Sequence, residues 1–290
     1  MLRAGAFDDY EVVEPMSAFK WKRLIQIGEV QHVLPYLSRG FSKHADDRQL
    51  TYTESLRQEV ERISDQQIPS VDASLLTITQ EEPQLTNFLS KRKLKKLRKR
   101  ELNSEDCSEE TLQMLNIIIH NVNQTLSKGI SLQGIIEMGR FLRTKGDKVD
   151  FVKLEQWLHQ LGITRLASLQ GSILIEVFHF DMNEIPFMQK EEKAASKLTQ
   201  RSLTHMAADT AENWHFRMRT NGMVENNSRV LRRNLRRSMR YMRYNPVETI
   251  SSFMANFAKA SVPVIVHPEG LAAVIVKAAF VDVAGISMIS

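Results

Sequence analysis

The sequence predicts a mainly α-helical protein, built as a multi-helix bundle. Apolar residues recur at three- and four-residue intervals through the middle of the chain, which is the period of an amphipathic helix. Residues suited to helix starts and ends separate these runs. The 290 residues include only 12 glycines and 8 prolines, fewer turn formers than a many-stranded β-sandwich or barrel needs. This composition leaves room for a small remnant sheet or a C-terminal hairpin.

The chain divides into four predicted segments. They are an N-terminal helical segment (1–64), a linker with a basic run (65–110), a helical bundle domain that includes an arginine-rich helix (111–260) and a C-terminal tail (261–290). In the first segment, Pro35 interrupts the helical pattern and is expected to start a new turn or helix. In the tail, a Pro-Glu-Gly turn at 268–270 is compatible with a hairpin or with a last helix.

The bundle domain gives the clearest helical pattern. An apolar stripe from Leu112 to Leu126 is followed by Gly129, which is suited to a helix end. Three further helices follow, and the residues expected to cap or end them are Ser131, Gly146, Asp150, Gly162 and Thr164. Four helices joined by short glycine-containing turns predict an antiparallel bundle.

Positive charge is concentrated in two segments. Residues 91–100 carry eight Lys or Arg and no acid, and residues 229–243 carry seven Arg and no acid. Because these segments contribute +15 to a net charge of +5, the rest of the chain carries −10. The sequence therefore describes an acidic body with two cationic segments.

The arginines of 229–243 fall on one arc of a predicted helix. They are Arg229, Arg232, Arg233, Arg236, Arg237, Arg240 and Arg243. Guanidinium groups match the geometry of phosphate, so this arc is a candidate site for a polyanion, with binding that weakens steeply as salt rises. The alternative is a solvated face that pairs with the acidic body.

The basic run at 91–100 has two interpretations. Repulsion between eight like charges favours either a solvated helical extension or a tether. Such a run attracts nucleic acid or an anionic membrane surface, but it is also typical of a solvated linker, the interpretation we favour from sequence. No aromatic residue interrupts the run, so base stacking is not indicated there.

Several segments resemble a family of uncharacterised nucleotidyltransferases. The resemblance lies in LNIIIHNVNQTLSKGISLQGIIEMGRFL (115–142), in Asp150 and in WLHQLGITRLASLQGSI (157–173). The family's opening helix is similar to FKWKRLIQIGEVQHVLPYL (19–37), and its closing Pro-x-Glu segment is similar to RYNPVETISSFMANF (243–257). The resemblance covers about half of the chain and implies a shared helical scaffold.

The catalytic elements implied by that resemblance are not found. A Gly-Ser turn and two carboxylates one residue apart, which hold a divalent metal, would be expected within residues 45–110. That interval has no glycine, and Asp46 and Asp47 are adjacent rather than alternating. Near His120 the family tends to have a second histidine where this chain has Gln124, and its acidic helix residue is Glu137 here. We therefore expect no catalytic residues, no metal site and no cofactor; Mg²⁺ would be needed only by a catalytic protein.

Other common sites are absent from the sequence. The single Cys107 excludes a disulfide framework, and the histidines show no metal-ligand spacing. Gly171-Ser172 followed by Asp181 has the wrong spacing for a nucleotidyltransferase site. No secretory signal and no window of 18 apolar residues is present, so we expect no membrane span and a cytoplasmic location.

Three functions follow in order of preference. The first is a nucleotidyltransferase-like protein, degenerate or truncated and non-catalytic, with a binding or regulatory role. The second is a helical protein that binds nucleic acid or another phosphate ligand through the arginines of 229–243. The third is an active metal-dependent nucleotidyltransferase whose site is not recognised. The expected partner is an anionic ligand, a nucleotide or a nucleic acid, and the sequence carries no signal for an oligomeric state.

Overall fold

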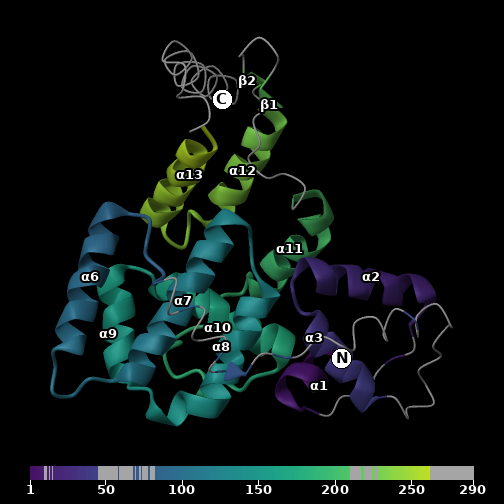
Figure 1. Cartoon of the computed structure of the whole chain (residues 1–290), viewed down its shortest axis with the longest axis horizontal. Coiled ribbons are helices and arrows are strands. Elements are labelled where there is room, and N and C mark those ends of the chain that lie inside the picture. Colours follow the sequence, from purple (N-terminus) through teal and green to yellow (C-terminus); the bar gives the residue numbers. More distant parts are fainter. Residues whose placement is uncertain are drawn as a thin grey trace.

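The structure, a computed structural model, is mainly α-helical, as the sequence predicts (Figure 1). It describes residues 1–9, 16–44, 82–209 and 228–261, the strand residues 217–218 and 224–225, and isolated residues between 12 and 78. For residues 204–209, 217–218, 224–225, 228–233 and 259–261 it describes the backbone only. Eleven α-helices lie in this part of the chain. The predicted C-terminal hairpin falls outside it.

The N-terminal helices form a small layer of their own. They are α1 (Leu2–Phe7), α2 (Ala18–Val30) and α3 (Leu34–Lys43). Pro35 stands in the first turn of α3, so the predicted new helix at this proline is confirmed. Gly5 lets α1 approach α3 closely, because a Cβ there would lie 1.8 Å from the Tyr36 carbonyl oxygen. Trp21, Ile25 and Phe41 form a core separate from the main one.

Four helices form the centre of the molecule and its main core. They are α7 (Glu109–Ser127), α8 (Leu132–Lys145), α9 (Phe151–Leu161) and α10 (Thr164–Phe178). The short 3-10 turns η1 (Gly146–Lys148) and η2 (Met182–Glu184) follow α8 and α10. The side of α7 from Met114 to Val122 is almost completely buried, and α7 contacts α8, α9 and α10.

The predicted caps of these helices are mostly confirmed. Ser131 and Asp150 each accept a backbone N–H from the residue three positions later, as N-caps do. The prediction for Thr164 is wrong: Ile163 holds the capping position and α10 begins at Thr164 itself. Gly162 explains the difference, because its left-handed backbone (φ 71°) ends α9 and leaves only one residue before α10.

The basic run belongs to the folded body, so the predicted linker at 65–110 is wrong for its last part. Residues 91–100 lie inside α6 (Phe88–Leu102), which runs beside α9 at one edge of the molecule (Figure 1). Leu94 and Leu97 are buried in the main core. Burying each leucine side chain contributes about 2 kcal/mol to stability. This gain outweighs the repulsion between neighbouring cations.

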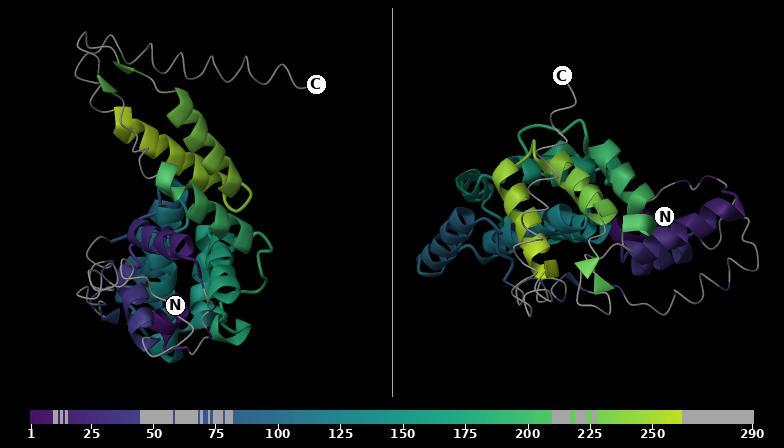
Figure 2. Two further views of the ribbon diagram at one scale, coloured as in Figure 1. Left: turned by 90° about the vertical axis from the view of Figure 1, so that its right-hand side faces the viewer. Right: turned by 90° about the horizontal axis from the view of Figure 1, so that it is seen from above.

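The remaining elements follow the central helices. α11 (Ala195–Asp209) contacts α10 and α2, and the strands β1 (Arg217–Met218) and β2 (Val224–Glu225) pair antiparallel. α12 (Ser228–Tyr241) and α13 (Pro246–Ser261) pack together and project from the body (Figure 2). No helix in the described part of the chain combines the length and the apolar character needed to cross a membrane.

The α12–α13 hairpin meets the body through the rings of Tyr241 and Tyr244 and through polar side chains. Its buried polar residues are Asn234, Ser238, Asn245, Glu248, Thr249 and Ser252. Its exposed large apolar residues are Met239, Val247, Ile250 and Met254. Tyr241 and Tyr244 join the main core at the end of α12, and specific hydrogen bonds add to their burial in fixing the position of the hairpin.

Glu248 links the hairpin to the segment before α6. Its side chain is 1% exposed and accepts the backbone N–H groups of Thr86 and Asn87, the latter at 3.1 Å. Asn245 caps α13 by accepting the Glu248 backbone N–H at 2.9 Å. Burial raises the pKa of Glu248, although the two N–H groups act in the opposite direction. One carboxylate therefore joins the start of α13 to the segment that leads into α6.

Two substitutions of Glu248 should separate its role as a hydrogen-bond acceptor from the effect of its charge. Glu248→Ala leaves two buried N–H groups without an acceptor and should lower the free energy of unfolding by about 3 kcal/mol. Glu248→Gln keeps one acceptor oxygen and should cost less.

The charge of Glu248 should make stability depend on pH. Because the folded protein raises the pKa of Glu248, wild-type stability should fall relative to Glu248→Gln as pH rises from about 4.3, and the difference should level off above the raised pKa. Urea unfolding at several pH values measures both effects; an alanine variant as stable as wild type would contradict this account.

Candidate polyanion-binding surface

The exposed side of α6 carries seven cations and no acidic side chain. These residues, defined here as the cationic face of α6, are Lys91, Arg92, Lys93, Lys95, Lys96, Lys99 and Arg100. The helix buries Leu94, Leu97 and Glu101, which recur at helical spacing on the opposite side. The same period that places these three residues inward therefore places the cations outward.

The eighth cation of the basic run has a structural role. Arg98 is half-buried and donates to the Pro83 carbonyl oxygen at 2.7 Å and to the Asn116 side chain. Burial lowers the pKa of Arg98. This arginine holds α6 against the segment before it and against α7, and we exclude it from the surface.

Six of the seven cations make no hydrogen bond or ion pair with any residue that the structure describes. The exception is Lys93, whose Nζ donates to the Gln160 carbonyl oxygen at 3.2 Å. The acidic body therefore does not neutralise this face through direct contacts in the described residues.

Both ends of α6 are fixed. Asn87 caps its start, since its side chain accepts the N–H groups of Leu89 and Ser90 at 3.0 and 3.1 Å. Near its end, the Glu101 carboxylate accepts Lys153 Nζ at 2.8 Å and the Ser108 N–H at 3.1 Å. The hydrogen bond with Glu101 raises the pKa of Lys153. These contacts attach α6 to α9 and to the start of α7.

The structure describes the side chains of four of the seven arginines in the predicted face of 229–243. Arg236 and Arg243 are exposed and Arg240 is half-buried. Arg237 instead donates to the Ser127 carbonyl oxygen at the end of α7, where a cation stabilises the helix terminus. The side chains of Arg229, Arg232 and Arg233 lie outside the described residues.

Two tyrosines beside these arginines are not free to stack on bases. Tyr241 is buried, and burial raises its pKa. Tyr244 is also buried, and its ring is covered by the guanidinium groups of Arg165 and Arg243, with centroid distances of 5.2 and 4.7 Å. Neither tyrosine therefore presents a free ring face to a base.

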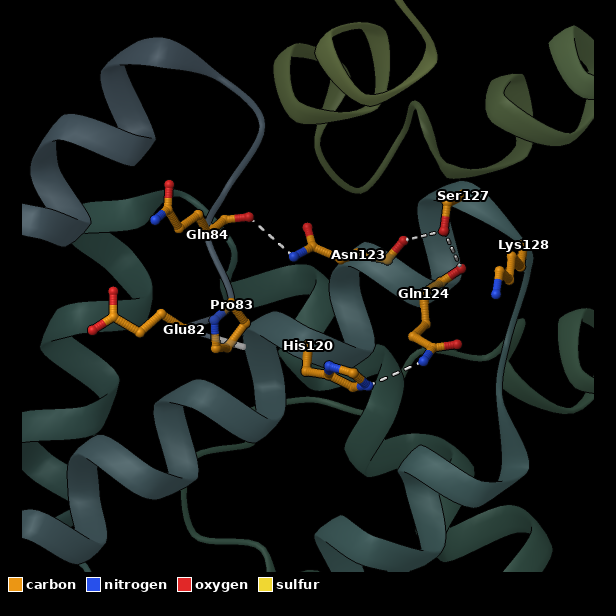
Figure 3. Close-up of a pocket in the computed structure, with 8 residues that line it drawn as sticks. All are labelled: Glu82, Pro83, Gln84, His120, Asn123, Gln124, Ser127 and Lys128. Carbon is orange, nitrogen blue, oxygen red and sulfur yellow. Dashed lines mark hydrogen bonds between the residues drawn. The ribbon is translucent and has the colours of Figure 1, made fainter. Parts of the chain in front are cut away.

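A polar hollow of about 430 Å³ lies between the segment before α6 and one side of α7 (Figure 3). Asn123 donates to the Gln84 carbonyl oxygen at 3.0 Å across it, and His120 Nε2 lies 3.0 Å from the Gln124 side-chain nitrogen. Lys128 and Glu82 also line it. Ser127, which also lines the hollow, donates its hydroxyl to the Asn123 and Gln124 carbonyl oxygens rather than to a base, so we assign no reaction to the hollow.

The positions singled out by the family resemblance are scattered. His120 lines the hollow on α7, whereas Glu137 lies on α8, where it accepts the Gln133 amide at 2.9 Å and burial raises its pKa. Gly171 and Ser172 fall within α10, and Cys107 is exposed. In the described part of the chain, no three His, Cys, Asp or Glu side chains gather in a way that could hold a metal ion.

Comparisons of the chain with protein-family models, with curated proteins and with solved structures give no match.

In the sequence, the eight cations of residues 91–100 outnumber the two leucines of the run, which favours a solvated linker over a packed helix. The helical signal consists of Leu94 and Leu97, which have the spacing of one helix face, and of Asn87, which precedes them at the capping position. Glu248, the carboxylate that joins α13 to this region, gave no signal beyond its place in the Pro-x-Glu segment.

Two leucines of α6 provide a matched test of its packing. Leu94 is 1% exposed and Leu102 is 68% exposed. Leu94→Ala should lower the free energy of unfolding by about 3 kcal/mol because it leaves a cavity, whereas Leu102→Ala should change it by about 0.5 kcal/mol or less. Thermal and urea unfolding measure both variants. Equal effects would mean that α6 is not packed as described.

Proposed function

We propose that this protein binds nucleic acid through the cationic face of α6. The observation that carries the proposal is that seven exposed cations stand on one side of an ordered helix whose other side is part of the core. Six of them have no partner among the described residues. Holding these side chains on a fixed helix lowers the ordering cost of binding.

The spacing of the charges suits a phosphate backbone. The cationic face spans residues 91–100, and at 1.5 Å per residue its seven charges lie about 2 Å apart along the helix axis. Duplex DNA carries one charge per about 1.7 Å of its axis. The two charge densities are similar, which favours counterion release on contact. The surface lacks the mixture of amide and arginine groups that reads bases, so we expect little sequence preference.

An anionic membrane is the competing partner. An interfacial helix needs an apolar side turned to the lipid, but the apolar residues within the basic run, Leu94 and Leu97, face the core. The exposed apolar residues of α6, Phe88, Leu89 and Leu102, stand at its two ends, outside the run. This arrangement supports nucleic acid as the partner.

The relation to nucleotidyltransferases remains a separate prediction that rests on the sequence resemblance alone. A non-catalytic member of such a family would keep a binding role, and the cationic face of α6 supplies one. We expect no metal and no cofactor for this activity, and a cytoplasmic location.

The test is a triple variant with a matched control. Lys95→Gln, Lys96→Gln and Lys99→Gln together remove three charges from the cationic face. The control, Lys20→Gln, Lys22→Gln and Arg23→Gln, removes the same charge from α2, at the opposite edge of the molecule (Figure 1). Binding to a fluorescent single-stranded oligonucleotide is measured between about 50 and 200 mM salt.

The triple variant should bind at least about tenfold more weakly at low salt, and its log–log salt slope should be less steep by about 2. The control should bind like wild type. Equal losses in both variants would mean that binding follows net charge rather than this surface. Wild-type binding to phosphatidylserine vesicles, without binding to the oligonucleotide, would instead identify a membrane as the partner.

A further inference from the structure

A second group of cations, the pair Arg165 and Arg243, lies near the N-terminal end of the cationic face of α6. Arg165 stands in the first turn of α10, and Arg243 follows α12. Both guanidinium groups lie over the ring of Tyr244, at 5.2 and 4.7 Å from its centroid. Such cation–π contacts fix the position of an arginine without neutralising its charge.

Hydrogen bonds hold this pair in place. The Arg165 side chain donates to the Arg243 carbonyl oxygen, and Arg243 donates to the Tyr244 hydroxyl, both at 2.6 Å. Tyr244 is buried, so the ring is a rigid base for both groups. Both guanidinium groups are therefore fixed on the same ring.

One carboxylate accompanies the two arginines. Glu192 accepts two N–H groups of Arg165 at 3.1 Å, while the Arg165 side chain stays 54% exposed. Arg243 is exposed and pairs with no carboxylate in the described residues. Its remaining N–H groups are available for an anion, and a guanidinium fork can bind phosphate through two parallel hydrogen bonds.

The pair is connected to α6 through the end of α9. Lys93 of the cationic face contacts the Gln160 carbonyl oxygen at 3.2 Å. Two residues later, the Gly162 carbonyl oxygen accepts the Asn245 amide at 2.8 Å, and Asn245 directly follows Tyr244. A short turn at residues 160–165 therefore separates the two groups of cations.

We propose that Arg165 and Arg243, fixed on the ring of Tyr244, form a second phosphate-binding point that continues the cationic face of α6 across the α9–α10 turn. The inference rests on the proposed function. A strand bound at both points runs from α6 toward the α12–α13 turn, rather than along the arginine face that the sequence predicts on α12. A phosphodiester group of a nucleic acid is the ligand.

Oligonucleotides of different lengths distinguish binding at the cationic face of α6 from binding at the Arg165–Arg243 pair. Wild-type affinity for single strands of increasing length, from about 4 to about 20 nucleotides, should rise again once the strand reaches the second point. Arg243→Gln should leave the shortest strands unaffected and weaken the longer ones about tenfold, with a salt slope less steep by about 0.7. The control Arg23→Gln, on α2, should have no effect at any length.

Glu192→Gln should change the affinity for longer strands in the opposite direction to Arg243→Gln. It removes the acid that competes for Arg165, so it should strengthen binding of the longer strands only. A purely structural role for Glu192 predicts a loss instead, and that loss would count against the inference. Circular dichroism and unfolding midpoints of each variant confirm that the fold is retained.

The outcomes distinguish the inference from the proposed function. If the α6 triple variant loses affinity while Arg243→Gln matches Arg23→Gln at every length, α6 binds alone and the second point is disproved. If the triple variant binds like wild type at every length, the proposed function fails, and the second point fails with it as an extension of α6.

Discussion

The placement of α6 depends on a buried carboxylate. Glu248 accepts the backbone N–H groups of Thr86 and Asn87, immediately before the helix begins, and it also stands in the first turn of α13. Buried N–H groups need an acceptor, so this carboxylate fixes the direction in which the chain enters α6. Burial raises the pKa of Glu248, so the two hydrogen bonds offset only part of the cost of burying the ionised carboxylate.

The chemistry of the surface follows from that placement. With its start fixed by Asn87 and its end by the Glu101–Lys153 pair, α6 turns Leu94 and Leu97 inward. The repelling cations are then held outward on a rigid helix instead of spreading apart on a tether. Fixed charge of this density attracts a polyanion more strongly than the same charges on a disordered chain, because less entropy is lost on binding.

The sequence predicted the helical class and the central helices because local signals determine them. Ser131 and Asp150 cap their helices as expected, since a cap needs only its own segment. The role of the basic run could not be predicted from charge, because its outcome depends on two leucines that meet a distant core. The arginines of α12 show the same limit: Arg237 binds the end of α7, a contact made across 110 positions of the chain.

Amide hydrogen exchange across residues 88–102, in the protein without any ligand, tests the central claim most directly. The account predicts that the amides of α6 exchange far more slowly than those of an unstructured chain, because the helix is packed before a polyanion arrives. Addition of a single-stranded oligonucleotide should change this protection only modestly. Amides that exchange at the unstructured rate, and become protected only when the oligonucleotide is present, would contradict a preformed cationic face and indicate a segment that folds on binding.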